Sequence, residues 1–338
     1  MQELYIIVNE KIFNKNKAYF CENKDVQSIV NYFSLKYKIF LISRYSFYYK
    51  PFKLKKLYNV LNLKLLNFLS FFSLLNFNRE KKKILIISIT PFNFIIFILL
   101  KFFLNCKFYL FLRSNGQEEY ENILGKKLVF TYDFMFRLIT RCSEIISCHQ
   151  RLYNKKCHIL FPSELTKNWI RKRKKNFFKK NIINILYIGR FKVEKGIYSL
   201  LNIFSQLPEN IKLTLVGNGN IIKTYDKRIK IVNFENIESK LIKIYDSSNI
   251  VILPSFTEAY PKIVDEALSR FRPVIIFKNI SYIVGQRKGV FIAKRNKKSL
   301  MKVIFNIKEN YKLIKNDMKK NILPTKKEFL ENFQKIIS

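Results

Sequence analysis

The sequence predicts an α/β protein with two doubly wound domains, in which parallel strands alternate with helices. Two apolar runs, residues 250–253 and 273–277, have the length and composition of strands that are buried on both faces of a parallel sheet. The residues between them, 261–271, carry apolar side chains at helical spacing. The same alternation recurs along all 338 residues, a length that favours two domains.

The unit at residues 250–277 carries two candidate site residues, Glu258 and Glu266. Glu258 follows the strand on a polar loop, and ligands of open α/β sheets bind at that edge. Pro261 suits the first helical position, and Glu266 borders the apolar face with its Cβ leaning toward the helix N-terminus. Both acids can therefore point at one spot, where the helix N-terminus suits a phosphate. Two solvated acids are the alternative interpretation.

A second polar turn follows the apolar run 183–188 and contains Gly189, Arg190 and Lys195. An arginine offers a planar fork to phosphate oxygens, and a lysine offers a movable point charge. Gly189 leaves room for close approach of a ligand at the strand end. The two cations are also two of 63 basic residues, but their placement in a βα unit favours an anion site.

The motifs P-S-x-x-E-x-x-P-x-x-x-x-E-A-L and G-R-x-x-x-E-K-G resemble the signatures of glycosyltransferase family 4. The resemblance covers roughly residues 184–296. It implies the GT-B fold, in which two Rossmann-like domains face each other across a cleft and a C-terminal helix crosses back to the first domain. The capping box and apolar stripe of residues 325–338 fit that helix.

The resemblance also implies roles for individual residues. Glu258 would contact the transferred sugar, Glu266 the ribose hydroxyls, and Arg190 and Lys195 the donor diphosphate. With Glu258, these two cations are the expected catalytic residues. The resemblance places these further residues at the donor site: Gly189, Gly217, Gly219, Tyr260, Lys262 and Ile263.

The chain departs from the family pattern in three places. Ala259, Tyr260 and Pro261 stand where many members have Gly-Phe-Gly, which removes one N–H. The loop at residues 88–93 lacks the histidine that many acceptor domains carry. Asn236 replaces a typical glycine near the base, so the base stays open. No D-x-D pair occurs, so we expect no metal and no cofactor.

The first domain lacks the glycine-rich turn of a dinucleotide fingerprint, which argues against an NAD or FAD enzyme. Arg113, Glu118 and Glu119 follow the apolar run 107–112 and are candidate acceptor-binding residues, although a solvated loop explains them equally. Residues 53–77 have a helical pattern that is first basic and then apolar. Either this helix packs on the sheet, or residues 53–83 contact an anionic membrane surface.

The net charge of +39 favours nucleic acid, anionic membranes or acidic ligands as partners, and AT-rich codons would produce part of it. The basic run 171–180 lies where a linker is expected. Five scattered cysteines without a C-x-x-C pair indicate a reducing compartment. Met1 leads directly into a strand, so we expect no signal peptide, and a cytoplasmic protein or one peripheral to the inner face of the cytoplasmic membrane.

The resemblance to family 4 implies a retaining, hexosyltransferase-like enzyme, and the missing D-x-D pair favours a metal-independent one. It would move a sugar from a nucleotide sugar to a glycan or lipid-linked acceptor, in polysaccharide or lipopolysaccharide assembly, without binding nucleic acid. An inactive transferase-like scaffold and a basic nucleic-acid-binding protein are the alternatives. We expect an acceptor domain at residues 1–170, a basic linker at 171–182, a donor domain at 183–322 and the crossover helix at 323–338.

Overall fold

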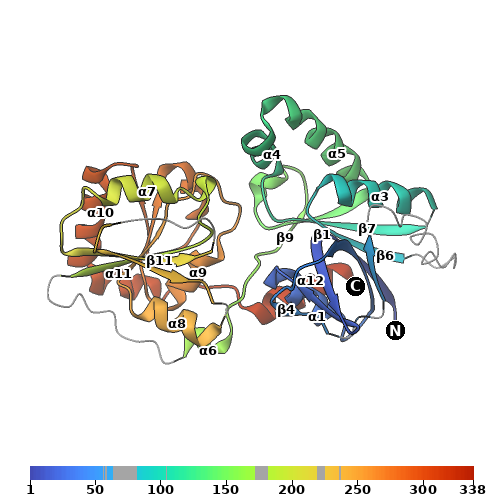
Figure 1. Cartoon of the computed structure of the whole chain (residues 1–338), viewed down its shortest axis with the longest axis horizontal. Coiled ribbons are helices and arrows are strands. Elements are labelled where there is room, and N and C mark those ends of the chain that lie inside the picture. The colour runs from blue at the N-terminus through green and yellow to red at the C-terminus, as the bar shows by residue number, and fades with distance from the viewer. Residues whose placement is uncertain are drawn as a thin grey trace. The chain divides into compact units, whose positions relative to one another are not determined.

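The computed structural model divides into two compact units, which we describe separately (Figure 1). Unit 1 combines Met1–Pro162 with Lys327–Ser338, and unit 2 consists of Ser163–Lys326. Residues 172–181 of the expected linker lie outside the part of the chain that the structure describes. That part comprises residues 1–55, 57, 59–63, 82–103, 105–171, 182–218, 225–235 and 237–338.

A nine-stranded sheet forms the centre of unit 1 within the described residues. Its strands are β1 (Glu3–Lys15), β2 (Ala18–Cys21), β3 (Lys38–Ser46), β4 (Phe52–Lys53), β5 (Asn59–Leu63), β6 (Lys82–Ile87), β7 (Cys106–Leu112), β8 (Ser143–Ser147) and β9 (His158–Ile159). Strands β1, β6, β7, β8 and β9 pair in that order, all parallel, and β3 and β5 extend the parallel sheet beyond β1. The expected parallel α/β sheet is therefore present.

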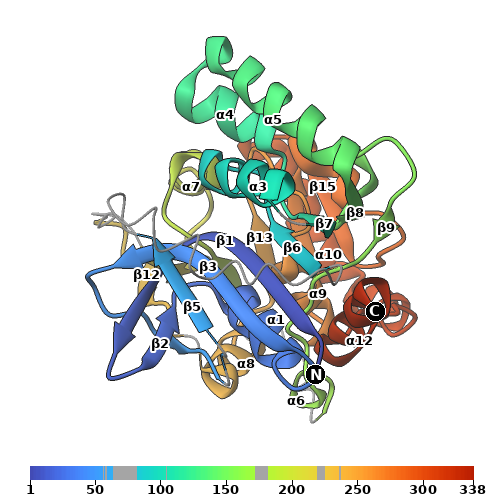
Figure 2. The same cartoon turned by 90° about the vertical axis from the view of Figure 1, so that its right-hand side faces the viewer.

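Helices cover both faces of this sheet (Figure 2). They are α1 (Lys24–Phe33), α3 (Pro91–Phe103), α4 (Gly116–Leu124), α5 (Val129–Cys142) and α12 (Lys326–Ile337). The side chains of Phe108 and Leu110 join the core under α3 and α5. Between them in sequence, Tyr109 and Phe111 contact α12, as the period of two of a strand requires.

The last helix, α12, packs in unit 1 although unit 2 precedes it in the chain. The ring of Phe333 contacts Phe33 of α1 at 5.5 Å and Phe111 of β7 at 5.0 Å between centroids. Tyr32 Oη donates to Gln334 Oε1 at 3.2 Å. The expected helix that returns to the first domain is confirmed.

The edge of unit 1 differs from the sequence-based expectation. Residues 59–63 form β5, paired with β3, so the helix predicted over residues 53–77 is wrong there. Residues 64–77, like most of the predicted membrane segment 53–83, lie outside the described residues. Strand β1 also continues into a hairpin with β2, where Asn16 and Lys17 have φ of 50° and 60°. Such a turn usually signals itself with glycine, which is absent here.

Unit 2 contains a six-stranded parallel sheet in the order β12-β11-β10-β13-β14-β15, again counting described residues. This order corresponds to 3-2-1-4-5-6, so the strand order reverses between β10 and β13, which are adjacent and parallel. Ligands of such sheets bind beyond the carboxyl ends of the strands at this reversal. The strands are β10 (Ile183–Ile188), β11 (Ile211–Gly217), β12 (Ile229–Asn233), β13 (Ile250–Leu253), β14 (Val274–Phe277) and β15 (Val290–Ala293).

Helices flank the second sheet, and their apolar faces form one core with the strands. They are α6 (Lys167–Ile170), α7 (Ile197–Phe204), α8 (Glu238–Asp246), α9 (Lys262–Ser269), α10 (Lys297–Glu309) and α11 (Tyr311–Met318), with short 3-10 turns η4 (Val193–Lys195) and η5 (Lys278–Ile283). Among the described residues, no helix has the length and hydropathy to cross a membrane.

Candidate active site

Two loops of unit 2 meet where the strand order reverses, between β10 and β13. One follows β10 and carries Arg190 and Lys195, and the other follows β13 and carries Glu258. Since β10 and β13 are adjacent and parallel, their carboxyl ends lie at the same edge of the sheet. The sequence motifs therefore converge at the place where the topology predicts a ligand.

The carboxylate of Glu258 is held by two donors. Lys195 Nζ and Ser255 Oγ each donate to Glu258 Oε1 at 2.7 Å. Only 12% of the Glu258 side chain is exposed. The hydroxyl of Tyr282 accepts from the Glu258 backbone N–H and donates to the Glu258 carbonyl, which holds the backbone as well. The acid is therefore fixed in position at the sheet edge.

The position of Lys195 depends on the glycine that follows it. Gly196 has a φ of 68°, and a Cβ there would lie 2.0 Å from the carbonyl oxygen of Pro254. The backbone N–H of Phe256 donates to the Glu194 carbonyl at 3.0 Å and joins the two loops. A side chain at residue 196 would push the lysine loop away from the loop of Glu258.

Arg295 binds the backbone of the loop that carries Glu258. The sequence did not indicate this role. Its Nη1 donates to the Pro254 carbonyl and to Ser199 Oγ, each at 2.9 Å. Its guanidinium lies over the rings of Phe256 at 4.1 Å and Phe277 at 4.4 Å. Burial lowers the pKa of Arg295. We interpret Arg295 as a positioning residue.

Arg190 differs from Lys195 because its side chain is 62% exposed. Its Nη2 lies 3.8 Å from Glu194 Oε1, and its backbone carbonyl accepts from Tyr187 Oη at 2.7 Å. The backbone of Arg190 is thus fixed, whereas its guanidinium projects into solvent from the loop after β10. An exposed ion pair of this kind contributes little free energy, so Arg190 can leave Glu194 and bind a phosphate at little cost.

Gly217 of the predicted donor site allows two backbone segments to approach closely. A Cβ at Gly217 would lie 2.0 Å from the Gly189 carbonyl oxygen, so the ends of β10 and β11 approach closely only because residue 217 has no side chain. Gly219 lies outside the described residues. The predicted contacts of Gly189 and Gly217 with a nucleotide remain predictions.

Helix α9 begins one residue later than the sequence suggested. Pro261 is the N-cap, with φ of −77° and ψ of 107°, and Lys262 is the first helical residue. The Pro261 carbonyl already accepts from the Val264 N–H at 3.1 Å, as an N-cap carbonyl does. Lys262 and Ile263 therefore occupy the first turn of α9 and are half-buried.

Tyr260 and Glu266 each have a partner within unit 2. Tyr260 Oη donates to Asp265 Oδ2 at 2.6 Å, and Arg287 Nε donates to Asp265 Oδ1 at 2.7 Å. Tyr245 Oη donates to Glu266 Oε2 at 2.6 Å. Glu258 and Glu266 are thus fixed by different partners, Glu258 from the loops and Glu266 from α8.

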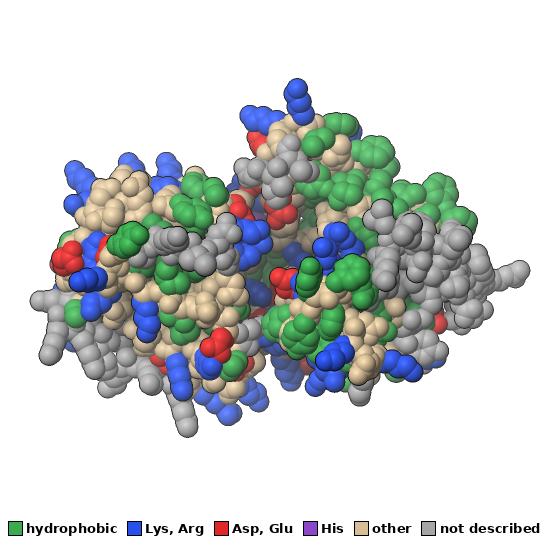
Figure 3. Space-filling view, viewed as in Figure 1, with side chains coloured by type: hydrophobic (Ala, Val, Ile, Leu, Met, Phe, Trp, Pro, Cys, Tyr) green, Lys and Arg blue, Asp and Glu red, His purple; other side chains and the backbone are tan. Residues whose placement is uncertain are grey.

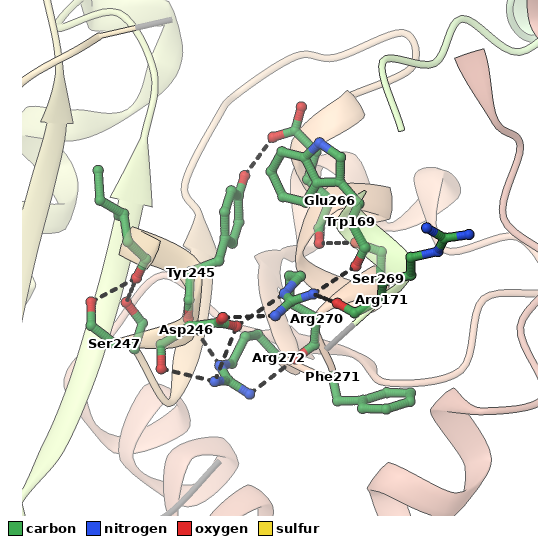
Figure 4. A network of polar contacts seen from close by, with 12 residues as sticks. Trp169, Arg171, Tyr245, Asp246, Ser247, Glu266, Ser269, Arg270, Phe271 and Arg272 are labelled. Atoms are coloured by element: carbon green, nitrogen blue, oxygen red, sulfur yellow. Dashed lines mark hydrogen bonds and ion pairs between the residues drawn. The ribbon is translucent and has the colours of Figure 1, made fainter. Parts of the chain in front are cut away.

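A buried network positions Tyr245 beneath Glu266 (Figure 4). Arg270 donates to both carboxylate oxygens of Asp246 at 2.9 and 2.7 Å, and to the Trp169 carbonyl at 2.8 Å. Arg272 donates to the carbonyls of Tyr245 and Asp246, each at 2.9 Å. Both arginines are essentially inaccessible to solvent. The network joins α8 to the end of α9 and so fixes the donor to Glu266.

The acceptor candidates of unit 1 lie at the carboxyl edge of its sheet. Arg113 follows β7, its Nε donates to Ser88 Oγ at 3.4 Å, and its Nη1 lies 3.9 Å from Asp25 Oδ2. Ser88 has a φ of 66°, a costly conformation for a residue with a side chain. Glu118 and Glu119 lie in the first turn of α4. The structure brings Arg113 to Ser88 and Asp25, two partners that the sequence did not suggest.

Glu10 of β1 adds an unusual acid to this edge. Its Oε1 accepts from the Glu22 backbone N–H at 3.1 Å, whereas its buried Oε2 has no partner among the described residues. Burial raises the pKa of Glu10 to about 7, although Arg113 acts in the opposite direction.

We predict that Glu10→Gln raises the melting temperature at pH 8 and leaves it nearly unchanged at pH 4.5. The raised pKa means that the folded chain binds the proton more tightly, so stability from this group is present below the unfolded pKa and is lost as the pH rises through about 7. The expected gain at pH 8 is about 1–3 kcal/mol. Thermal melts across this pH range measure it. Glu309→Gln, at an exposed acid of unit 2, should show no such pH dependence, and a parallel pH profile for both variants would contradict the assignment.

The family model of glycosyl transferases group 1 matches residues 169–322. This part of the chain, which contains the motifs around Arg190 and Glu258, is similar to the glycosyl transferases group 1.

Two curated proteins that are named glycosyltransferases each match about a third of the chain. A putative teichuronic acid biosynthesis glycosyltransferase, TuaC of Bacillus subtilis strain 168, is 28% identical over 121 residues, which are 35% of this chain and 31% of that protein. An uncharacterized glycosyltransferase of Methanocaldococcus jannaschii is 25% identical over 130 residues, 34% of this chain and 33% of that protein. The matches therefore span about a third of the length of these relatives.

Solved structures resemble the whole chain. Sucrose-phosphate synthase from Thermosynechococcus elongatus has a TM-score of 0.71 at 12% identity, covering 99% of this chain and 98% of that chain. HepE from Anabaena, in complex with UDP and glucose, has a TM-score of 0.68 at 12% identity, covering 100% and 99%. WaaG, a glycosyltransferase involved in lipopolysaccharide biosynthesis, has a TM-score of 0.61 at 12% identity, with 99% of each chain covered. The predicted GT-B fold, with its two Rossmann-like sheets, is confirmed.

Proposed function

We propose that the chain is a retaining glycosyltransferase that binds a nucleotide sugar on unit 2. The proposal rests on the pair Lys195–Glu258. Lys195 Nζ lies 2.7 Å from Glu258 Oε1, at the point where the strand order of the unit 2 sheet reverses. Arg190 lies on the same loop as Lys195. One fixed carboxylate with two cations suits a ligand that presents sugar hydroxyls beside a diphosphate.

In the proposed reaction, the bond between the anomeric carbon and the β-phosphate oxygen breaks while the acceptor oxygen bonds the same face of that carbon. The acceptor proton passes to the leaving phosphate, so atoms and charge balance without a separate base. Lys195 has three N–H donors, and only one is needed for Glu258. The others can bind the leaving phosphate, where Lys195 and Arg190 stabilise the growing charge. Glu258 then holds hydroxyls of the transferred sugar.

The relatives support a UDP-sugar donor and an acceptor in cell-envelope assembly. HepE was solved with UDP-glucose, TuaC is named for teichuronic acid biosynthesis, and WaaG for lipopolysaccharide biosynthesis. We propose a glycan or lipid-linked acceptor, bound near Arg113 of unit 1, with Glu118 and Glu119 as further candidates. All five cysteines are free, which suits a cytoplasmic enzyme or one peripheral to the membrane.

A thermal-shift series with UDP-, GDP- and ADP-glucose, followed by donor hydrolysis, tests the proposal. We expect a rise in melting temperature with one nucleotide class and slow hydrolysis of that donor without an acceptor. Binding without hydrolysis or transfer would instead indicate an inactive scaffold. Salt-sensitive binding of random oligonucleotides, with no response to any nucleotide sugar, would favour a nucleic-acid-binding protein.

We predict that Tyr245→Phe raises the donor KM several-fold and changes kcat little. The substitution removes one hydrogen bond to the Glu266 carboxylate, a loss of about 1.5–3 kcal/mol for a charged acceptor. Glu266 then keeps its charge but loses one of the contacts that orient it toward the ribose. Steady-state kinetics with varied donor measure the effect. Tyr32→Phe, which removes the bond from Tyr32 Oη to Gln334 Oε1 in unit 1, is the matched control. Equal KM values for both variants would contradict the role of Tyr245.

A further inference from the structure

The outward side of α3 is apolar, although a helix that covers a sheet in water normally carries polar residues there. Asn93, Ile96, Phe97 and Leu100 form its buried side. The opposite stripe contains Pro91, Ile95 and Phe102 at helical spacing, whereas Ile98 packs partly against the core. Ile95 is 50% exposed and Phe102 is 81% exposed. The fold does not account for these side chains, because α3 already buries its other face.

Helix α5 lies beside α3 and extends this surface. The rings of Phe94 and Phe134 are 6.0 Å apart near the start of both helices, and Lys101 Nζ lies 2.8 Å from Cys142 Sγ near their ends. On α5, Phe130 and Phe134 are 67% and 53% exposed. Figure 3 shows hydrophobic side chains gathered over these two helices. We call Ile95, Phe102, Phe130 and Phe134 the α3–α5 face.

The rim of the α3–α5 face is basic. Arg137 and Arg141 continue the outward stripe of α5 beyond Phe134, and Lys101 is exposed at the end of α3. Lys126 and Lys127 lie just before α5. Two nearby acids offset them only in part, since Glu121 lies 3.7 Å from Lys126 and Asp133 bonds Gln117. Cations thus border an exposed apolar surface on two adjacent helices.

We propose that the α3–α5 face docks the protein on an anionic lipid bilayer. The three phenylalanines enter the boundary between headgroups and acyl chains, and the rim cations contact lipid phosphates. A second copy of this chain fits less well, because it would bring two basic rims together. The surface is distinct from the predicted membrane segment 53–83. Docking itself requires no substrate. The further inference that the bilayer presents a lipid-linked acceptor rests on the proposed function.

Sedimentation of the full chain with vesicles of phosphatidylglycerol and phosphatidylcholine tests the docking without any donor. We expect binding that falls as salt rises and is weak on neutral vesicles. The variant Phe102→Ser/Phe130→Ser/Phe134→Ser should bind at least about tenfold more weakly, since each exposed ring loses its burial in lipid. Circular dichroism should show unchanged folding, because all three side chains are largely exposed.

The matched control is Phe47→Ser/Tyr48→Ser, at two aromatic side chains of unit 1 that are 75% and 80% exposed. This variant should bind vesicles like the unmodified chain. Equal weakening of both variants, or undiminished binding of the triple variant, would overturn the proposal. The proposal would also be overturned if the unmodified chain formed a dimer that the triple variant, but not the control variant, fails to form.

A tryptophan placed on the face gives an independent readout. Phe130→Trp should be quenched by brominated lipid, while the native Trp169, only 3% exposed in unit 2, should not. Absence of quenching would show that the face stays in water and would contradict docking. Vesicle binding without any transferase activity would contradict the proposed function and still support docking. The two proposals can therefore be refuted separately.

Discussion

Glu258→Gln is expected to lower sugar transfer by about 10²-fold or more, the scale of losing one transition-state contact. The amide keeps the shape of the acid and can still accept from Ser255, but it loses the charge that pairs with Lys195. The loop is also held through the backbone by Tyr282 and by Arg295, so the fold should persist. Initial rates with a responding donor and thermal melts measure the two effects.

The matched control for this prediction is Glu209→Gln in the same unit. Glu209 lies just before β11, at the amino edge of the sheet, and its side chain is 91% exposed. The same change of charge should leave transfer unaffected there. If Glu258→Gln retained activity within about threefold of the unmodified chain, Glu258 would have no place at the reaction centre.

Unit 2 was largely predictable because its local patterns agree with its fold. The strand Ile250–Leu253 is buried on both faces, so it forms one unbroken apolar run that few other structures produce. The polar turns containing Arg190, Lys195 and Glu258 interrupt such runs at their carboxyl ends. Motif and topology therefore indicated the same edge of the sheet.

Unit 1 was less predictable because its edge strands carry weaker patterns. The run 59–63 contains Asn59 and Asn62, so it is neither an unbroken apolar run nor a strict alternation, and basic residues before it suggested an amphipathic helix. Pairing with β3 decides its structure, and that contact is not local. Likewise, the Asn16–Lys17 turn lacks the glycine that usually marks a hairpin.

The residues that hold the site in place were invisible in the sequence. Arg295 reaches the Pro254 carbonyl across 41 positions, and Arg270 reaches the Trp169 carbonyl across 101. Among 63 lysines and arginines, nothing local separates these two supporting arginines from the other basic residues. Sequence motifs identify residues that would touch a ligand, whereas the supporting contacts depend on the tertiary fold.

Arg190→Ala and Lys195→Ala are each expected to lower kcat/KM strongly, with kcat falling as well as KM rising. Charge on the leaving phosphate is largest in the transition state, so cations that bind it act most strongly there. Arg190→Ala should leave the melting temperature nearly unchanged, because the side chain is 62% exposed. Lys195→Ala also removes a bond to Glu258, at a cost of about 1.5–3 kcal/mol. Lys192→Ala, an exposed lysine of the same loop, is the matched control and should stay active.

Two further variants and a chelator separate the diphosphate role from simple loss of charge. Arg190→Lys should rescue activity only partly, because lysine cannot make the bidentate contact of a guanidinium. The double variant Lys195→Ala/Glu258→Gln should lose less than the sum of its single losses, since the two side chains share one ion pair. Turnover should be indifferent to EDTA, because the two cations offset the charge of the leaving phosphate. Loss of activity in EDTA that Mn²⁺ restores would show that a metal carries this charge, and the assignment of Arg190 and Lys195 would then be wrong.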